Sequence, residues 1–186
     1  MNLLDLTPIM TSDTTPAPYA VYASNYDTTN SSASLPYRAF NKQSTYTWTW
    51  GAGIRQAWID FWFNEIVTVD YVKIECTSAV TYPKQILIYG SNDRSTYNLI
   101  YDTGTISNTN YPLLIKIPRS KYKCFRLDCV GVNQTSTYIK HTINNIYYYQ
   151  DLDYTNPSEI IKEAVKNAIK NNTLIQKIVT ATEENK

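Results

Sequence analysis

The sequence predicts an all-β fold, a jelly-roll β-sandwich of about eight short strands with a C-terminal helical tail. Short segments alternate between apolar and polar residues and end at turn residues such as Ser91-Asn92-Asp93. Only 18% of the residues are charged, whereas 17 of the 186 are tyrosine. Polarity carried by hydroxyl and amide groups suits strands and also a polar recognition surface. An amphipathic helical pattern begins only at Asn156, where the composition changes.

The expected elements follow in chain order. Residues 1–17 contain Pro8 and Pro16 and predict an extended N-terminal arm. Residues 18–150 are expected to form the sandwich, with the polar residues 24–36 as a long surface loop. The expected strands are Tyr19–Ala23, Ala57–Phe63, Ile66–Glu75, Lys84–Gly90, Asn98–Asp102, Tyr111–Ile117, Lys121–Val130 and Thr142–Tyr149. Strands of this length and spacing are typical of a sandwich or jelly roll.

Residues 151–186 predict an amphipathic helical tail. Asn156, Pro157 and Glu159 have the residue types of a helix start, and an apolar stripe continues to about Lys170. A second, shorter helix with the same stripe is expected from Leu174 to Ala181. The stripe either packs against the sandwich or meets a partner or another copy, and the pattern leaves both possibilities open.

The net charge of +1 gives no long-range field that would attract nucleic acid or an anionic membrane. No apolar run approaches the roughly 18 residues of a membrane span. The N-terminus, Met1 to Pro8, lacks a basic region and a long apolar core, so no secretory signal is predicted. We therefore expect synthesis in the cytoplasm, with neither nucleic acid nor membrane as a partner.

The three cysteines do not have the spacing of a disulfide framework. Cys124 and Cys129 are an odd number of residues apart in one expected strand, which places them on opposite faces. Cys76 could pair with either of them across the sheet, but buried free thiols are the default expectation.

Residues from about Met10 to Tyr149 resemble discoidin-like modules, the coagulation-factor-type C and galactose-binding-like domains. No single motif is specific, but their order and spacing together are. The segment from Ile9 to Pro16 is similar to the start of such modules in bacteriophage tail proteins. The other matching segments, in order, are Arg38-Ala39-Phe40-Asn41, Trp48, Trp58-Ile59-Asp60-Phe61, Gly90-Ser91-Asn92-Asp93, Tyr122-Lys123-Cys124-Phe125-Arg126-Leu127 and Ile143-Asn144-Asn145-Ile146-Tyr147-Tyr148. The resemblance implies a sandwich that binds sugars or lipid head groups and seldom catalyses a reaction.

Two departures from the family pattern have consequences. Many carbohydrate-binding relatives hold a structural Ca²⁺ near an Ala-Phe-Asp loop, with a glutamate of the closing strand as a further ligand. The corresponding positions here are Asn41 and Asn145, whose neutral amides disfavour calcium, so no cofactor is expected. Arg94 stands where the family turn usually has glycine, which we expect to change the turn type and not the fold.

The candidate ligand-binding residues lie in or beside expected loops, which in the family cluster at one end of the sandwich. Strict alternation places Tyr46, Trp48 and Trp50 on one face. Trp48 resembles a core tryptophan of the family, whereas Trp50 is as suited to an exposed stacking platform as to the core. Arg55 is either a hydrogen-bonding group or an ordinary exposed arginine. The full set is Trp50, Arg55, Tyr82, Tyr46, Tyr138 and His141, with Tyr26 and Tyr37 as weaker candidates.

An enzyme is not expected. The chain has one histidine, and it lacks a nucleophile elbow, a metal-spaced cluster and a phosphate-binding loop. The leading hypothesis is a non-catalytic carbohydrate-binding or adhesion module on the tail, baseplate or head of a phage-type particle. Its partners would be a host-surface glycan and, through the C-terminal helices, other virion proteins, with multiple copies per particle. The alternative is a structural decoration or adaptor protein of a virion that binds no sugar.

Overall fold

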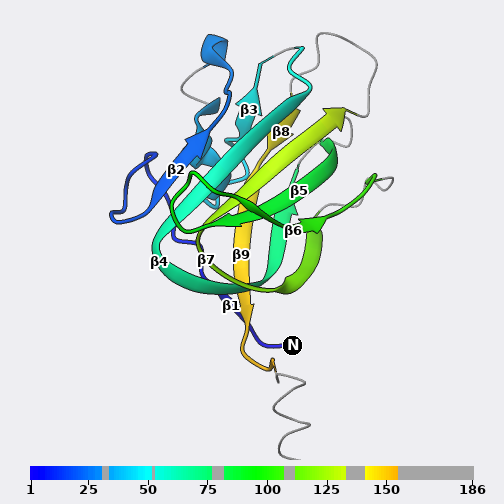
Figure 1. Ribbon diagram of the computed structural model, residues 1–186. Coiled ribbons are helices and arrows are strands. Elements are labelled where there is room, and N and C mark those ends of the chain that lie inside the picture. The colour runs from blue at the N-terminus through cyan, green and yellow to red at the C-terminus, as the bar shows by residue number, and fades with distance from the viewer. Residues whose placement is uncertain (31–33, 52, 77–81, 107–111, 133–140, 155–186) are drawn as a thin grey trace, which may run out of the picture. The chain divides into compact units, whose positions relative to one another are not determined.

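The computed structural model describes residues 1–30, 34–51, 53–76, 82–106, 112–132 and 141–154, with the backbone alone for Asn30, Val132 and His141. These residues form an all-β fold, as the sequence predicts (Figure 1). The predicted helical tail from Asn156 lies outside the described residues, as does Tyr138. The strands are β1 (Leu3–Asp5), β2 (Ala20–Ala23), β3 (Trp48–Trp50), β4 (Gln56–Glu75), β5 (Pro83–Ser91), β6 (Asn98–Asp102), β7 (Leu113–Val132), β8 (His141–Ile143) and β9 (Asn145–Asp151), with two short 3-10 helices, η1 (Thr28–Asn30) and η2 (Pro36–Phe40).

Two long bent strands, β4 and β7, belong to both layers of the sandwich. Residues 56–62 of β4 pair with residues 124–130 of β7. On one side of this pair β2 pairs with β4, and on the other β5 pairs with β7 and then with β6. The other halves of β4 and β7 also pair with each other, and this half of β4 pairs on its other side with β9, which in turn pairs with β1. A separate two-stranded sheet joins β3 to β8. Figure 1 shows β4 and β7 bending together at the lower end of the sandwich, so that each runs through both layers.

The chain continues as one strand through each bend, so four of the expected strands are observed as two, β4 and β7. Asn64 has a positive φ of 66°, and the register between β4 and β7 shifts between Trp62 and Val67. A second shift lies between Val69 and Tyr71. This irregularity changes the face that the following side chains occupy, so Val69 and Ile74 both lie in the core although simple alternation places them on opposite faces.

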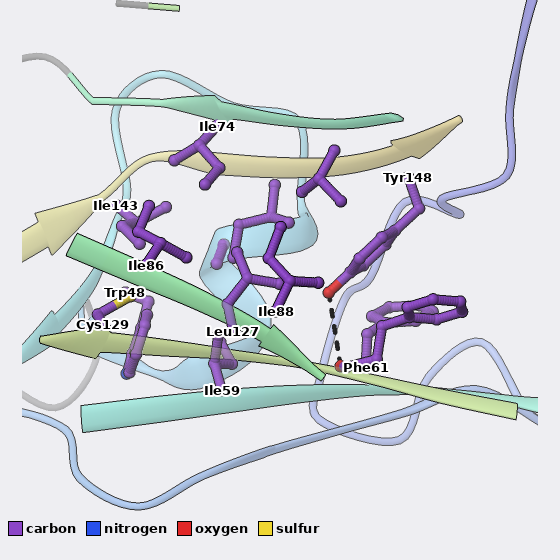
Figure 2. Close-up of a cluster of buried hydrophobic side chains, with 14 of the residues drawn as sticks. Trp48, Ile59, Phe61, Ile74, Ile86, Ile88, Leu127, Cys129, Ile143 and Tyr148 are labelled. Atoms are coloured by element: carbon purple, nitrogen blue, oxygen red, sulfur yellow. Dashed lines mark hydrogen bonds between the residues drawn. The ribbon is translucent and has the colours of Figure 1, made fainter. Parts of the chain in front are cut away.

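The core between the layers consists of aromatic and branched aliphatic side chains. Figure 2 shows Ile74 and Tyr148 on one side of it and Ile59, Phe61 and Leu127 on the other. The hydroxyl of Tyr148 donates to the carbonyl oxygen of Phe125 at 3.5 Å, which gives this buried polar group a partner. Because the cluster runs between strands of both layers, its burial holds the two layers together.

The first 17 residues, which we expected to form an extended arm, contribute to the sandwich. Strand β1 pairs with β9, from Leu3 opposite Asp151 to Asp5 opposite Tyr149. Met10 is 1% exposed and lies in the core. The sequence gives little signal for this strand because it is three residues long and its pairing partner lies more than 140 residues away.

A charged cluster fixes the turn between β5 and β6 on the outer face of the sheet. Asp60 of β4 is fully buried, and its carboxylate accepts hydrogen bonds from Arg126 Nε (2.6 Å) and Nη2 (2.9 Å). The hydroxyl of Tyr97 also donates to Asp60, at 2.6 Å. The Arg126 guanidinium stacks between the rings of Trp58 and Tyr97, at 3.8 and 3.7 Å from their centroids. Burial and then the Asp60 carboxylate raise the pKa of Tyr97.

The same turn shows what Arg94 does in place of glycine. Its φ is +60°, a conformation that glycine adopts without strain and that costs other residues about 1–2 kcal/mol. The fold is retained, and the Arg94 guanidinium lies 3.2 Å from the centroid of the Tyr22 ring, where a cation–π contact is favourable. The turn therefore keeps a left-handed residue, and the arginine side chain fastens it to β2.

All three cysteines are free. Cys129 packs in the core, whereas Cys124 is on the opposite face of β7, as their odd spacing predicts. Burial, followed by the charge of Asp60, raises the pKa of Cys124 to about 12. Both thiols of β7 are therefore buried and protonated at neutral pH.

Candidate binding site

Several strands begin or end at one end of the sandwich, where β3 and β8 lie in Figure 1. Backbone pairing places Trp50 opposite His141, Gln56 opposite Val130, and Pro83 opposite Val132. Connections that are distant in sequence therefore meet here. We call this region the loop end and define it by residues 24–29, 51, 53–56, 82–84 and 131.

The first long loop is held against β3 by two hydrogen bonds that Asn25 accepts and one that Asp27 donates. The amide N–H of Gly51 donates to Asn25 Oδ1 at 3.0 Å, and Trp48 Nε1 donates to the Asn25 carbonyl oxygen at 3.0 Å. The N–H of Asp27 donates to the carbonyl oxygen of Thr49 at 2.7 Å. These bonds fix the backbone on both sides of Tyr26, so the loop presents that ring from a defined position.

The neighbouring loop is fixed in the same way. The N–H of Ile54 donates to the carbonyl oxygen of Gly51, and the N–H of Gly131 donates to that of Arg55 at 2.8 Å. Gly53 has a φ of +80°, which a glycine adopts freely and which lets the chain turn tightly before β4. Arg55 and Ile54 follow this turn and are exposed.

An aromatic ring, an apolar side chain and a guanidinium are thus exposed on the two adjoining loops. Tyr26 is 39% exposed and Ile54 37% exposed. A tyrosine ring can stack on the apolar face of a sugar ring, and a guanidinium offers several N–H donors to hydroxyl oxygens. This chemistry needs neither a metal nor a long-range field. Among the described residues, no group of three or more His, Cys, Asp or Glu side chains could hold a metal ion.

The structure distributes the predicted site residues differently from the expectation. Trp50 is 0% exposed and packs against Trp48 at 4.6 Å between ring centroids, and Tyr82 is 4% exposed. Neither ring is available for stacking, so Trp50→Ala would probe the core and not the site. Arg55 is exposed at the loop end, as predicted. His141 pairs through its backbone with Trp50.

Tyr46 is exposed, but it belongs to a different cluster. The Arg38 guanidinium lies 4.1 Å from the centroid of the Tyr46 ring and 4.7 Å from that of Tyr37. Tyr46 precedes β3, whereas the loop end follows it, and strands rise about 3.3 Å per residue. Tyr46 is therefore separated by the length of β3 from Gly51 and residues 53–56, the part of the loop end that holds Arg55.

Sequence reasoning gave Tyr26 little weight because it lies in a run of polar loop residues. The useful signal is the asparagine before it, since Asn side chains often fix loop backbone. Its partner, Gly51, is 26 residues away, so the pairing depends on the fold.

No protein-family model matches the chain, and no curated protein matches it. Solved structures do match. Chitosan-binding module 1 from a Paenibacillus sp. IK-5 chitosanase/glucanase is 22% identical, with a TM-score of 0.58 over 70% of this chain and 94% of that one. The module CpGH89CBM32-5 from Clostridium perfringens, in complex with GalNAc-β-1,3-galactose, is 9% identical, with a TM-score of 0.60 over 71% and 95%.

Larger proteins contain the same fold. A Ruminococcus gnavus GH29 fucosidase matches 77% of this chain with 27% of its own, at 15% identity and a TM-score of 0.61. These similarities show that the chain has the galactose-binding-like, discoidin-like fold of carbohydrate-binding modules, as the sequence motifs imply. In the described part of the chain, no helix has the length and apolar composition to cross a membrane.

Proposed function

We propose that this domain is a non-catalytic carbohydrate-binding module whose site is the loop end. The main observation behind the proposal is that the exposed ring of Tyr26 and the exposed Arg55 lie on two loops that are joined by the hydrogen bond from Gly51 to Asn25. Tyr26 stacks on a sugar ring while Arg55 donates to its hydroxyl groups. The fold of carbohydrate-binding modules supports this assignment. A shallow site of this kind binds weakly, with a dissociation constant around 1 mM, or about −4 kcal/mol.

Tyr26→Ala and Arg55→Ala are each expected to weaken glycan binding about tenfold, which corresponds to about 1.4 kcal/mol. The measurement is binding to a glycan array and to isolated bacterial cell-wall polysaccharide, with chitosan oligosaccharides and GalNAc-β-1,3-galactose included. Tyr101→Ala is the matched control, because Tyr101 is similarly exposed (36%) but lies on β6. Equal losses in all three variants, or binding unchanged in the two site variants, would place the site elsewhere.

The setting that we propose is a phage-type particle, with a host-surface glycan as ligand. Its support is the similarity of residues 9–16 to modules of phage tail proteins and the amphipathic pattern from Asn156. Several copies on one particle would raise a weak affinity by orders of magnitude through avidity. A particle protein that binds no glycan and serves as a structural adaptor is the alternative.

Removing residues 156–186 is expected to convert a self-associated chain into a monomer without unfolding the sandwich, if the apolar stripe meets the stripe of another copy. The molar mass from light scattering and the thermal unfolding curve measure the two effects separately. A truncated chain that is unfolded would instead indicate that the stripe packs on its own domain. Failure of the full chain to bind any glycan, together with stable incorporation into particles, would favour the structural adaptor.

A further inference from the structure

The loop that follows η2 is fastened to the start of β9 by asparagine side chains. Asn144 Nδ2 donates to the carbonyl oxygen of Ser44 at 3.0 Å, and Asn145 Nδ2 donates to that of Gln43 at 3.5 Å. Asn41 Oδ1 accepts from the N–H of Gln43 at 2.9 Å. We call these five residues the amide clasp. Its three asparagines are at most 4% exposed, whereas Gln43 and Ser44 are exposed, so buried amides hold an exposed loop.

The charge of the Glu75 carboxylate, beside the clasp, is already compensated by Lys73. Glu75 accepts from Asn145 Nδ2 at 2.9 Å, and its other oxygen lies 2.6 Å from Lys73 Nζ. Burial alone would raise the pKa of Glu75, but the hydrogen bonds from Lys73 and Asn145 and the charge of Lys73 outweigh it and lower the pKa. The Tyr147 hydroxyl donates to Glu75 at 3.3 Å, and the Lys73 and Lys42 ammonium groups lie 4.9 and 5.8 Å from the centroid of the Tyr147 ring.

Calcium is the cofactor that the family resemblance implies at the positions of Asn41 and Asn145. The structure brings both residues to Gln43, so the two positions do adjoin. The groups present do not fit the ion, because Ca²⁺ takes six to eight oxygen ligands and several of them are usually anionic. Two backbone carbonyl oxygens that a cation could use accept hydrogen bonds from amide groups instead.

The Asn41 amide is also oriented against a cation. Its oxygen accepts from Gln43, so its buried Nδ2 group points the other way, and no hydrogen bond of that nitrogen is found in the described structure. Turning the amide to offer its oxygen would break the bond to Gln43. A cation would therefore meet N–H donors and the Lys73 ammonium group. The buried Asn145 Oδ1, for which no hydrogen bond is found in the described structure, is a single neutral oxygen and falls short of the anionic ligand set that Ca²⁺ usually takes.

We propose that the amide clasp takes the place of a divalent cation, so that this loop keeps its conformation, and the domain its stability, without calcium. The side-chain N–H groups of Asn144 and Asn145 link the loop to β9, as a shared ion would otherwise do. The same neighbourhood becomes a calcium site when anionic oxygens replace the amides of Asn41 and Asn145.

Thermal unfolding of the full chain in excess calcium chloride and in excess EDTA tests the proposal. The wild-type protein is expected to give the same Tm in both, and calorimetric titration with calcium is expected to give no binding heat. Asn144→Ala is expected to lower the Tm by several degrees equally in both solutions, because the buried Asn144 side chain no longer links Ser44 to the start of β9. Asn98→Ala, on the exposed edge strand β6, is the matched control and is expected to leave the Tm unchanged.

Asn41→Asp combined with Asn145→Glu is expected to give a Tm that rises with calcium concentration, as a site that binds only the folded state requires. A wild-type Tm that rises with calcium, or falls in EDTA, would overturn the proposal. So would an Asn144→Ala variant as stable as the Asn98→Ala control. A folded double variant whose Tm does not change with calcium concentration would show that these positions do not define a cation site.

Discussion

Asp60→Asn is expected to lower the free energy of unfolding by about 3 kcal/mol or more. The substitution keeps the shape of the side chain but removes the charge that Arg126 binds through two nitrogens. It also replaces the acceptor of the Tyr97 hydroxyl, and Asp60 is fully buried, so water cannot compensate. Urea-induced unfolding followed by tyrosine and tryptophan fluorescence measures the change.

The matched control for this change is Asp102→Asn. Asp102 also accepts hydrogen bonds, from Gln85 and from the N–H of Gly104, but it is exposed on β6. Its replacement is expected to cost about 1 kcal/mol or less. Similar losses for the two variants would mean that the buried cluster does not hold the turn between β5 and β6.

Gly90→Ala is expected to destabilise the domain by about 1–3 kcal/mol through overpacking. A Cβ atom at this position would clash with Cδ2 and Cε2 of Tyr122 and would lie 2.5 Å from its Cγ. The Cγ atom is one bond from the Tyr122 Cβ, so the ring cannot swing aside without changing its first torsion. The ring also packs edge-on against Phe125 at 5.9 Å. The fold therefore requires glycine here because of a close approach.

A double-mutant cycle with Tyr122→Ala isolates this contact. In the absence of the ring, Gly90→Ala is expected to cost much less than it does in the wild type, and the difference is the interaction energy. Gly51→Ala is the control, since a Cβ there meets atoms no closer than 3.5 Å. An equal cost of Gly90→Ala with and without the ring would contradict the steric explanation.

Local sequence patterns predicted the strands that are long enough to show alternation. Asn98–Asp102 is observed with the predicted bounds, and Lys84–Gly90 differs from β5 by one residue at each end. The bend at Asn64 and the register shift after Val69 were not predicted, because they depend on how β4 meets β7. Alternation also showed that Trp48 and Trp50 share a face, but not that the core covers that face.

The candidate site was predictable only in part, for a related reason. Arg55 lies in a loop whose exposure the sequence indicates. The joining of the Tyr26 loop to the Arg55 loop depends on the bond from Gly51 to Asn25, and the clasp depends on Asn144 reaching Ser44 across 100 residues. Motif resemblance located Asn41 and Asn145, but only the geometry shows that Asn41 Oδ1 accepts from Gln43 and that Asn145 Nδ2 donates to Gln43 and Glu75.

Chemical-shift mapping of the wild-type domain tests directly whether a glycan binds at the loop end. The bound glycan is the best-retained member of the array, titrated into isotope-labelled protein in the presence of EDTA. The shifts are expected to concentrate at Tyr26, Ile54 and Arg55, to saturate, and in Tyr26→Ala to require about tenfold more glycan. Saturating shifts centred instead on Tyr101 and β6, or no shifts with any glycan, would contradict carbohydrate binding at the loop end.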